Sequence, residues 1–400
     1  MNILFLTIAK IDEIETSSLF KDLLRKFAKE GHNLYIVSPA ERRYNEPTQV
    51  LNISNVCILK VRTLNIQQCS VIEKGLSTIL IESQFYRAIK KYFIGVKFDL
   101  VLYSTPPITF IKIVDKIKKH FNAKSYLMLK DIFPQNAVDL GLFTNKSLIY
   151  RYFRLKEKKL YQLSDYIGCM SPANVDYLLT HNNSIDANCV EICPNSIDIE
   201  ANLLNVDKFA VRYEYEIPDE AILFFYGGNL GKPQGIDFLL DVLKSQINNM
   251  KVFFLIIGSG TEYDKIKNWI FTSKARNVQL HAYVPKEKYN YLLCSADVGL
   301  IFLDKRFTIP NFPTRLLGYL LNRMPVLLAI DKSTDVGKII ENNGCGFWVE
   351  SGDLYSFNRR IDYFINNKNA INIMGENGYK MLVDGYGVNR TYETIMRHFE

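Results

Sequence analysis

Short apolar runs alternate with longer stretches of helical periodicity along almost the whole chain. In the first half the runs occupy residues 2–8, 32–37, 56–62, 99–103, 124–129, 165–170 and 188–192. In the second half they occupy residues 221–226, 251–257, 277–280, 297–302 and 325–329. Apolar runs separated by amphipathic segments are typical of parallel strands that are connected by helices. The pattern therefore predicts an α/β protein built from two series of βαβ units.

Four amphipathic segments predict helices that bear on the domain organisation. Long helical patterns cover residues 71–93 and 147–163, and a shorter one covers residues 389–399. Another helix follows the first strand and ends at Gly31. Its candidate N-caps are Thr16, Ser17 and Ser18, because a hydroxyl side chain at this position accepts a hydrogen bond from the first turn.

The two series meet at the segment Pro194-Asn195-Ser196-Ile197-Asp198 and the polar stretch after it. We expect two Rossmann-like domains that face each other across a cleft, at residues 1–196 and 197–384, with a final helical segment at residues 385–400. Ligands of such folds bind beyond the carboxyl ends of the strands. The loops at those ends are therefore where functional residues are sought.

Composition narrows the class of protein. Of the 400 residues, 48% are hydrophobic and 23% are charged, which is the balance of a globular protein. No apolar run reaches the ~18 residues that span a bilayer. The first residues lack the basic region and the cleavage site of an export signal. The seven cysteines are scattered, which favours free thiols in a reducing cytosol and predicts a cytoplasmic protein.

Positive charge is concentrated in one part of the chain. Residues 60–160 contain 19 Lys and Arg but 7 Asp and Glu, whereas the net charge of the whole chain is +7. Such an excess attracts anionic lipid, nucleic acid or a phosphate-bearing substrate, or it forms a plain solvated surface. Nucleic acid is the poorer explanation, because no helix-turn-helix, RNP-like or zinc pattern accompanies the charge.

Two glycine-rich loops follow strands of the second series. Gly227-Gly228-Asn229-Leu230-Gly231-Lys232 precedes a helix, where free backbone amides can hold a phosphate, and Gly258-Ser259-Gly260 follows the next strand. Glycines in such turns are structural about as often as they are functional. The second loop lacks the third glycine of a dinucleotide fingerprint, so NAD binding is not favoured.

Three further loops carry candidate chemistry. Thr314 can cap the next helix while Arg315 presents its guanidinium beside the same N-terminus, which resembles an anion site. Tyr283 and Val284 provide a place for a nucleobase to stack or to bond to the backbone; the alternative is a simple turn in which Pro285 opens a helix. Asp335 ends the loop after the strand at residues 325–329, where it is a candidate ligand or only a helix cap.

The order of these loops resembles the donor-binding half of the family 4 retaining glycosyltransferases. The motifs that carry the resemblance are Tyr226-Gly227-Gly228-Asn229-Leu230-Gly231, Ile256-Ile257-Gly258-Ser259-Gly260, Ala296-Asp297-Val298-Gly299-Leu300 and Pro313-Thr314-Arg315-Leu316-Leu317-Gly318-Tyr319 with Met324-Pro325-Val326. The Cys193-Pro194-Asn195-Ser196-Ile197-Asp198 segment is similar to that family's inter-domain segment. Within the family, Lys130-Asp131-Ile132-Phe133-Pro134, Asn311-Phe312-Pro313-Thr314-Arg315 and Thr334-Asp335-Val336-Gly337 look most like bacterial transferases of capsule and O-antigen synthesis that add N-acetyl-fucosamine.

This resemblance implies a GT-B fold, in which the N-terminal domain receives the acceptor and the C-terminal domain binds a nucleotide sugar. The last helix then returns to the first domain. The implied reaction is a retaining, hexosyltransferase-type transfer from a UDP-sugar without a cofactor or a metal ion. The expected donor-binding residues are Gly228, Asn229, Gly231, Lys232, Gln234, Gly258, Gly260, Tyr283, Val284, Pro313, Thr314 and Asp335.

The sequence also departs from the family pattern. Many members carry two glutamates in an E-x7-E arrangement, and the corresponding positions here are Pro310 and Gly318. The family's arginine and lysine after the first strand of this domain correspond to Asn229 and Gln234. Lys232 and Arg315 must then supply much of the charge that stabilises the diphosphate. We expect Arg315 to be catalytic, while ribose recognition stays unassigned.

On the acceptor side, Asp131 follows the strand at residues 124–129. A carboxylate there can orient or deprotonate an acceptor hydroxyl, although such an Asp is as often a turn residue; the resemblance favours a catalytic role. Lys130 and Glu13 are the candidate acceptor-binding residues, with Glu15 as an alternative to Glu13.

The helix expected at residues 147–163 offers a use for the basic excess. Its basic residues are Arg151, Arg154, Lys156, Lys158 and Lys159, preceded by Lys146, and they interleave with Leu148, Ile149, Tyr150, Tyr152, Phe153, Leu155 and Leu160. Part of this apolar set must pack on the sheet, and the rest can enter a bilayer whose phosphates meet the cations. The hypothesis is a peripheral enzyme on the cytoplasmic face of the inner membrane that uses a polyprenyl-diphosphate-linked saccharide.

Two other functions are compatible with twin Rossmann domains. A UDP-sugar 2-epimerase isomerises its substrate without an acceptor, but its clustered acidic and histidine residues are hard to find among five histidines. A noncatalytic UDP-sugar-binding subunit is suggested by the missing glutamate pair.

Overall fold

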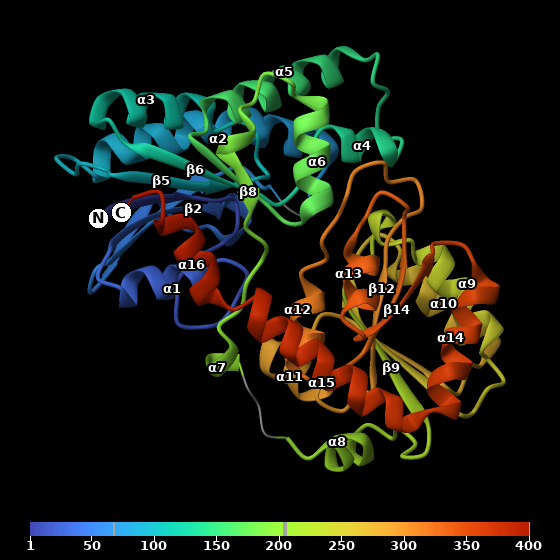
Figure 1. The fold of residues 1–400 in the computed structure, drawn as a ribbon. Helices are drawn as coiled ribbons and strands as arrows, with labels where there is room; N and C mark the ends of the chain where they lie inside the picture. Colours follow the sequence, from blue (N-terminus) through green and yellow to red (C-terminus); the bar gives the residue numbers. More distant parts are fainter. Residues whose placement is uncertain (67–68, 203–205, 400) are drawn as a thin grey trace. The chain divides into compact units, whose positions relative to one another are not determined.

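The computed structural model describes residues 1–66, 69–202 and 206–399, and it contains two compact units. Met1–Asp198 and Val388–Glu400 form the first unit, and Ile199–Gly387 form the second. The expected boundaries after residues 196 and 384 fall within three residues of this division. Each unit is a mostly or wholly parallel sheet with helices on both faces, which is the predicted α/β class (Figure 1).

The sheet of the first unit has eight strands in the order β3-β4-β2-β1-β5-β6-β7-β8. All neighbours are parallel except β3 and β4, which are antiparallel. The strands are β1 Asn2–Leu6, β2 Asn33–Glu41, β3 Gln49–Ile53, β4 Val56–Thr63, β5 Leu100–Ser104, β6 Lys124–Leu129, β7 Tyr166–Cys169 and β8 Val190–Ile192. The strand β3 was not predicted, because its partly exposed residues lack an apolar run.

Helices cover both faces of this sheet, because successive side chains of a strand point to opposite sides. Leu4 and Leu6 of β1 belong to the core beneath α2, α3 and α5. Ile3 and Phe5 face the other way, toward α1 and α16, which lie side by side in Figure 1. The helices are α1 Lys21–Lys29, α2 Val71–Tyr92, α3 Ile111–Phe121, α4 Gln135–Asp139, α5 Leu148–Leu163, α6 Pro172–His181 and α16 Val388–Met396, with 3-10 turns η1 Arg42–Tyr44 and η2 Ala187–Cys189.

The last helix of the chain is held to the first unit by polar contacts. The Val388 amide donates to the carbonyl of Ile197 at 3.1 Å. The hydroxyl of Tyr392 lies 2.9 Å from Nε2 of His32, and Nε2 of His398 lies 3.0 Å from Oε1 of Glu191. The helix begins one residue before the expected segment at residues 389–399 and ends three residues earlier.

The sheet of the second unit has six parallel strands in the order β11-β10-β9-β12-β13-β14. They are β9 Ile222–Asn229, β10 Val252–Ser259, β11 Val278–His281, β12 Val298–Phe302, β13 Val326–Ile330 and β14 Gly346–Glu350. The edge strand β14 was not predicted, because its apolar run is only Phe347-Trp348-Val349, between Gly346 and Glu350. The strand β9 continues through Gly227, Gly228 and Asn229, which pair with Ile257, Gly258 and Ser259 of β10, so the predicted turn begins later.

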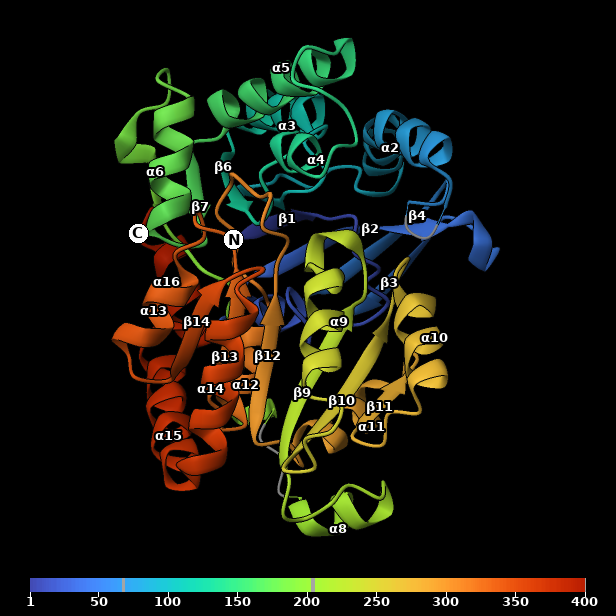
Figure 2. The ribbon, with the colours of Figure 1, turned by 90° about the vertical axis from the view of Figure 1, so that its right-hand side faces the viewer.

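Helices also cover both faces of the second sheet. The core beneath α9, α10 and α14 contains the alternate β9 residues Ile222, Phe224 and Tyr226, and Figure 2 shows α9 in front of this sheet. Phe225 points to the other face, where its ring contacts Tyr289 of α11 and Tyr319 of α12. The helices are α7 Ile199–Asn202, α8 Lys208–Glu214, α9 Ile236–Ser245, α10 Tyr263–Ser273, α11 Lys286–Leu293, α12 Arg315–Leu321, α13 Val336–Asn342, α14 Leu354–Asn366 and α15 Lys368–Gly385, with the 3-10 turn η3 Lys232–Gln234.

The predicted side-chain cap of the first helix is wrong. The N-cap of α1 is Phe20, and it makes no side-chain capping bond. The hydroxyl of Ser17 donates instead to Oδ2 of Asp22 at 2.8 Å, because a carboxylate within the first turn competes for the hydroxyl. For the helix expected at residues 147–163, the Ser147 hydroxyl does accept from the Tyr150 amide at 3.1 Å.

Candidate active site

The ends of β9 and β10 approach each other so closely that only glycine fits. A Cβ atom on Gly258 would lie 1.9 Å from the carbonyl oxygen of Gly228, and one on Gly260 would lie 2.4 Å from that of Leu230. The Leu230 amide donates to the carbonyl of Ser259 at 2.9 Å, which holds the two segments together. The predicted donor-loop glycines are thus brought together by backbone packing.

Asn229 and Gly231 lie next to these glycines. A Cβ atom on Gly231 would lie 3.0 Å from Nδ2 of Asn229, and a Cβ atom on Gly260 would lie 2.8 Å from its Oδ1. The hydroxyl of Tyr226 donates to the carbonyl of Asn229 at 2.7 Å, which fixes the backbone there. The amide side chain of Asn229 is exposed and can offer neutral donors to a ligand.

Arg315 is the cation of this cluster. Its guanidinium carbon lies 4.7 Å from the centre of the Tyr226 ring, and its Nη2 donates to Oε1 of Gln234 at 2.5 Å. A Cβ atom on Gly228 would lie 3.3 Å from the same guanidinium carbon, so the glycine leaves the guanidinium face open. The structure therefore places two predicted donor-site residues, Gln234 and Gly228, next to the guanidinium of Arg315.

One nitrogen of this guanidinium has no partner. Nη1 of Arg315 is buried and makes no hydrogen bond within the described part of the chain. A buried charged donor without an acceptor costs about 1–3 kcal/mol or more, and an anion that binds there removes this cost. This nitrogen marks the place where the cluster can accept an anionic ligand.

Two tyrosines beside Arg315 were not predicted. The Tyr319 hydroxyl accepts from the Gly227 amide and donates to the carbonyl of Leu300, both at 3.2 Å. A Cβ atom on Gly227 would lie 2.1 Å from the hydroxyl oxygen of Tyr289. Burial raises the pKa of Tyr289 to about 12, so this hydroxyl stays protonated beside the guanidinium. Tyr319 lies one helical turn after Arg315, and that spacing was the available signal.

The capping role predicted for Thr314 is wrong. Thr314 is the N-cap of α12, but its side chain makes no capping bond, and its φ of −62° and ψ of −28° are helical. A side-chain cap requires an extended backbone at this position. Thr314 is exposed, Pro313 is partly exposed, and both immediately precede Arg315.

Asp335 likewise makes no side-chain cap for α13. The ordering carboxylate of this loop is Asp331, whose Oδ1 accepts from the amides of Ser333 and Thr334, both at 2.9 Å. The hydroxyl of Thr334 donates to Asp331 at 2.8 Å and accepts from the Asn311 amide at 3.0 Å. These bonds tie the loop after β13 to the loop before α12, and burial raises the pKa of Asp331.

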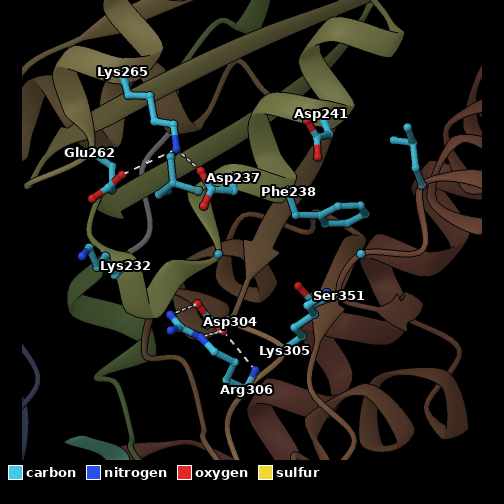
Figure 3. Close-up of a pocket in the computed structure, with 14 residues that line it drawn as sticks. Lys232, Asp237, Phe238, Asp241, Glu262, Lys265, Asp304, Lys305, Arg306 and Ser351 are labelled. Carbon is cyan, nitrogen blue, oxygen red and sulfur yellow. Dashed lines mark hydrogen bonds and ion pairs between the residues drawn. The ribbon is translucent and has the colours of Figure 1, made fainter. Parts of the chain in front are cut away.

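Lys232 does not join the Arg315 cluster. It lines a cavity of about 600 Å³ whose wall also contains Asp237, Phe238, Lys265 and Lys305 (Figure 3). Arg315 does not line this cavity. The expectation that Lys232 and Arg315 share the diphosphate charge is therefore not supported by the positions of the two side chains.

Tyr283 and Val284 lie between β11 and α11. The Tyr283 side chain is 80% exposed, so its ring is free to stack on a ligand. Pro285 is the N-cap of α11 and precedes its first residue, Lys286, which is the simple-turn alternative. The geometry is compatible with either role.

In the first unit, Lys130 and Asp131 follow β6. The hydroxyl of Thr105 accepts from the Lys130 amide at 3.0 Å and from the Asp131 amide at 3.2 Å, and it lies 3.0 Å from the carbonyl oxygen of Asp131. This clamp holds the backbone while the Asp131 side chain is exposed. Burial lowers the pKa of Lys130 to about 8, so its ammonium loses a proton more readily than an ordinary lysine.

Glu13 is engaged within its own loop. Its carboxylate accepts from the Thr16 amide at 2.9 Å and forms an ion pair with Lys21. Partial burial opposes ionisation, but the bonds from Lys21 and Thr16 outweigh it and lower the pKa of Glu13 to about 2. An acceptor would have to compete with these contacts.

The helix α5 divides its apolar residues between the core and the surface. Leu160 and Tyr161 are buried, and the Phe153 ring lies 5.0 Å from that of Phe133. Leu148 is 80% exposed and Leu155 is 60% exposed. Other exposed residues of the same helix are Ile149, Arg151, Tyr152, Lys158 and Lys159.

Arg154 differs from the other cations of α5. It pairs with Glu157 at 2.5 Å and donates to Asn182 at 2.8 Å. Its guanidinium is thus committed to protein partners, so Arg154 is a poor candidate for a lipid contact. Among the described residues no helix is both long and apolar enough to cross a bilayer, and no group of His, Cys, Asp or Glu is arranged to hold a metal ion.

Comparisons with known proteins agree with this architecture. Residues 207–381 match the family model described as "Glycosyl transferases group 1". The chain is 21% identical to the probable glycosyltransferase WbjE of Pseudomonas aeruginosa over 87% of this chain and 85% of that protein. It is 21% identical to the putative colanic acid biosynthesis glycosyl transferase WcaI of Escherichia coli, over 35% of this chain and 34% of that protein.

Two solved structures share the fold over its whole length. Sucrose-phosphate synthase from Thermosynechococcus elongatus has a TM-score of 0.78 at 13% identity and covers 100% of this chain and 98% of its own. HepE from Anabaena in complex with UDP-glucose has a TM-score of 0.71 at 14% identity, and the match covers 100% of this chain and 99% of HepE. The family match at residues 207–381 lies within the second unit, and the whole chain shares the fold of these two solved structures.

Proposed function

We propose that this chain moves an N-acetylated deoxyaminosugar, with N-acetyl-L-fucosamine as first choice, from a UDP-sugar to a lipid-linked saccharide in capsule or O-antigen synthesis. The transfer retains the anomeric configuration and needs no metal ion. The observation that carries the proposal is the buried, unpartnered Nη1 of Arg315 in the described chain, beside Gly228.

The leaving group explains why this cluster suits the reaction. Breaking the anomeric bond leaves negative charge on a diphosphate, and preorganised donors stabilise that charge. Arg315 contributes the cation. The side-chain oxygen of Gln234, Oε1, accepts a hydrogen bond from Arg315. The NH2 group of the same amide is therefore left to donate to a ligand. Asn229 adds a second neutral amide, so the two amides take the positions at which the family pattern has cations.

On the acceptor side, Asp131 is the proposed residue that orients or deprotonates the incoming hydroxyl. The bonds from the Lys130 and Asp131 amides to Thr105 support this role, because they fix the backbone from which the exposed carboxylate extends. Lys130, directly before it, offers an amine that can exchange a proton near neutral pH.

The lipid-linked acceptor is supported by the surface of the first unit. The helix α5 exposes Leu148 and Leu155 among Arg151, Lys158 and Lys159. Exposed apolar side chains interleaved with cations fit a bilayer with anionic headgroups. This is the basis for a peripheral position on the cytoplasmic face of the inner membrane.

The comparisons support a nucleotide-sugar donor and a polysaccharide product. HepE is described in complex with UDP-glucose, and WcaI is named for colanic acid biosynthesis. The finer choice of N-acetyl-fucosamine rests on the resemblance of the Lys130-Asp131-Ile132-Phe133-Pro134 and Asn311-Phe312-Pro313-Thr314-Arg315 motifs.

The test is UDP release from a panel of UDP-sugars that includes UDP-N-acetyl-fucosamine, with and without a membrane extract that holds lipid-linked acceptors. Release that needs both one sugar and the lipid fraction is the expected result. Isomerised UDP-sugar without lipid would identify an epimerase instead. Tight UDP-sugar binding without release under any acceptor would identify a binding subunit and overturn the proposed activity.

A further inference from the structure

The cavity that contains Lys232 is separate from the Arg315 cluster. It lies on the face of the second sheet that α9, α10 and α14 cover, and neither Arg315 nor Gln234 lines it. Its volume of about 600 Å³ falls within the range of small-molecule sites. Figure 3 shows its charged side chains arriving from several different segments of the unit.

Two ion pairs within the cavity engage half of its charged side chains. Arg306 binds Asp304 through two nitrogens, at 2.9 and 2.7 Å. Lys265 forms an ion pair with Asp237 and lies 3.9 Å from Glu262, and Figure 3 shows its nitrogen between these two carboxylates. Burial opposes ionisation of Asp304, but the Arg306 contacts outweigh it and lower the pKa of that carboxyl.

Lys232 and Lys305 are the exceptions. Neither ammonium group has an acidic partner within 4.0 Å in the described residue ranges, and both side chains are exposed at the cavity. Among the described residues the wall carries four cations and four carboxylates, so its charges balance, but these two ammonium groups have no ion-pair partner and can each contact an anionic ligand.

The segments that carry the two lysines are tied to each other. The Asp304 amide donates to the carbonyl of Pro233 at 3.0 Å, and the Gly235 amide donates to that of Lys232 at 3.1 Å. Gly235 has a φ of 56°, and a Cβ atom there would lie 2.9 Å from the carbonyl oxygen of Leu303. The backbone on which both cations stand is therefore fixed before any ligand binds.

The rest of the wall fits a carbohydrate. Asp237 and Asp241 lie one turn apart on α9, and their carboxylates can accept hydrogen bonds from hydroxyl groups. Phe238 also lines the cavity, but it is 7% exposed and its ring packs against Phe302 and Phe357, so it forms the floor of the cavity and not a stacking surface. The α9 N-terminus, which begins at Ile236, adds the positive end of a helix dipole.

We propose that this cavity is a second ligand site that binds a phosphorylated sugar, with the phosphate on Lys232 and Lys305 and the hydroxyls on Asp237 and Asp241. The site goes beyond the donor site of the proposed function and does not depend on it. It also assigns Lys232 a role other than the donor diphosphate.

The test is calorimetric titration of the full chain with glucose 1-phosphate, with glucose and inorganic phosphate as separate probes. The wild type is expected to bind glucose 1-phosphate more tightly than either separate probe. Lys232→Ala and Lys305→Ala are each expected to weaken this binding about tenfold, because each removes a charge-assisted bond. Lys267→Ala, an exposed lysine of α10 outside the cavity, should bind like the wild type.

A repeat of the titration in saturating UDP separates this site from the donor site. Unchanged binding in UDP and in Arg315→Ala is the expected result. Binding that UDP abolishes, equal binding in Lys232→Ala and the wild type, or no binding of glucose 1-phosphate would each overturn the proposal. Thermal melting of every variant shows whether the fold is intact, so a loss of binding is not mistaken for unfolding.

Discussion

The guanidinium carbon of Arg315 lies 4.7 Å from the centre of the Tyr226 ring. Tyr226 belongs to β9, and Arg315 is the first residue of α12, so the contact fixes the cation at the carboxyl end of the strand. An aromatic face stabilises a cation partly removed from water without using its hydrogen-bond donors. Nη2 donates to Gln234, and Nη1 is left to bind an anion.

The close approach of β9 and β10 predicts a sharp difference between two glycine substitutions. Gly258→Ala should lower the free energy of unfolding by about 1–3 kcal/mol, because its Cβ would meet the Gly228 carbonyl oxygen at 1.9 Å. Gly318 lies within α12, and the atom nearest to a Cβ placed there by Gly318→Ala is a Leu293 methyl at 3.8 Å. It should leave stability unchanged or raise it by up to about 1 kcal/mol. Urea unfolding measures both, and an equal loss would contradict the packing described.

Lys130 predicts a specific pH dependence of stability. Burial lowers its pKa to about 8 in the folded chain from 10.5 in an exposed lysine, so between these values the unfolded chain binds more protons. The free energy of unfolding of the wild type, relative to Lys130→Met, should therefore rise as the pH increases from 8 to 10.5. Urea unfolding across this range measures the difference. Lys124→Met, at the exposed start of β6, should show no such trend. A difference between the wild type and Lys130→Met that does not change with pH would contradict the prediction.

The ion pair of Glu13 predicts that the stability of the chain depends on pH in the acid range. Its pKa of about 2 means that the ion pair with Lys21 stabilises the folded chain above the ordinary glutamate pKa. Glu13→Gln should lower the free energy of unfolding by about 1 kcal/mol at pH 7, since the pair is partly exposed. The deficit should shrink as the pH falls from 4.5 toward 2. Glu15→Gln, an exposed neighbour, is the matched control, and a deficit of the same size at both ends of the range would exclude the ion pair as its cause.

The surface of α5 predicts binding to anionic vesicles. The double variant Leu148→Ser/Leu155→Ser should cosediment with phosphatidylglycerol vesicles about tenfold more weakly, because two side chains exposed by 80% and 60% no longer enter the lipid. Ile373→Ser removes an apolar side chain that is 63% exposed in the second unit, and it should bind as the wild type does. Equal cosedimentation of all three proteins would show that Leu148 and Leu155 of α5 do not contact the lipid.

Much of the fold could be predicted from hydrophobic patterning, because buried parallel strands are nearly continuous apolar runs. The strands β6 and β12 match their predicted segments closely for this reason. The strands β3 and β14 were missed because their apolar signal is interrupted, in β3 by Gln49 and Asn52 and in β14 by Gly346 and Glu350 at its two ends.

The candidate site could be predicted in part. Glycine spacing directed attention to the loops that contain Gly228 and Gly258, but their mutual backbone approach was not predicted. Helix position singled out Arg315. The partners of Arg315 could not be read from the sequence, because Tyr226 and Tyr289 come from distant elements that only the folded sheet brings together. The assignment of Lys232 to the diphosphate stays a prediction, and the structure shows only that Lys232 lines a cavity that Arg315 does not line.

The most direct test of the donor site is calorimetric titration of UDP into the wild type and into Arg315→Ala. We predict that the wild type binds UDP and that the variant binds at least about tenfold more weakly, because it loses a charged donor that the fold leaves unpaired. Arg276→Ala, an exposed arginine of the same unit, should bind as the wild type does. Wild-type affinity in a folded Arg315→Ala protein would contradict the assignment of this cluster to the diphosphate.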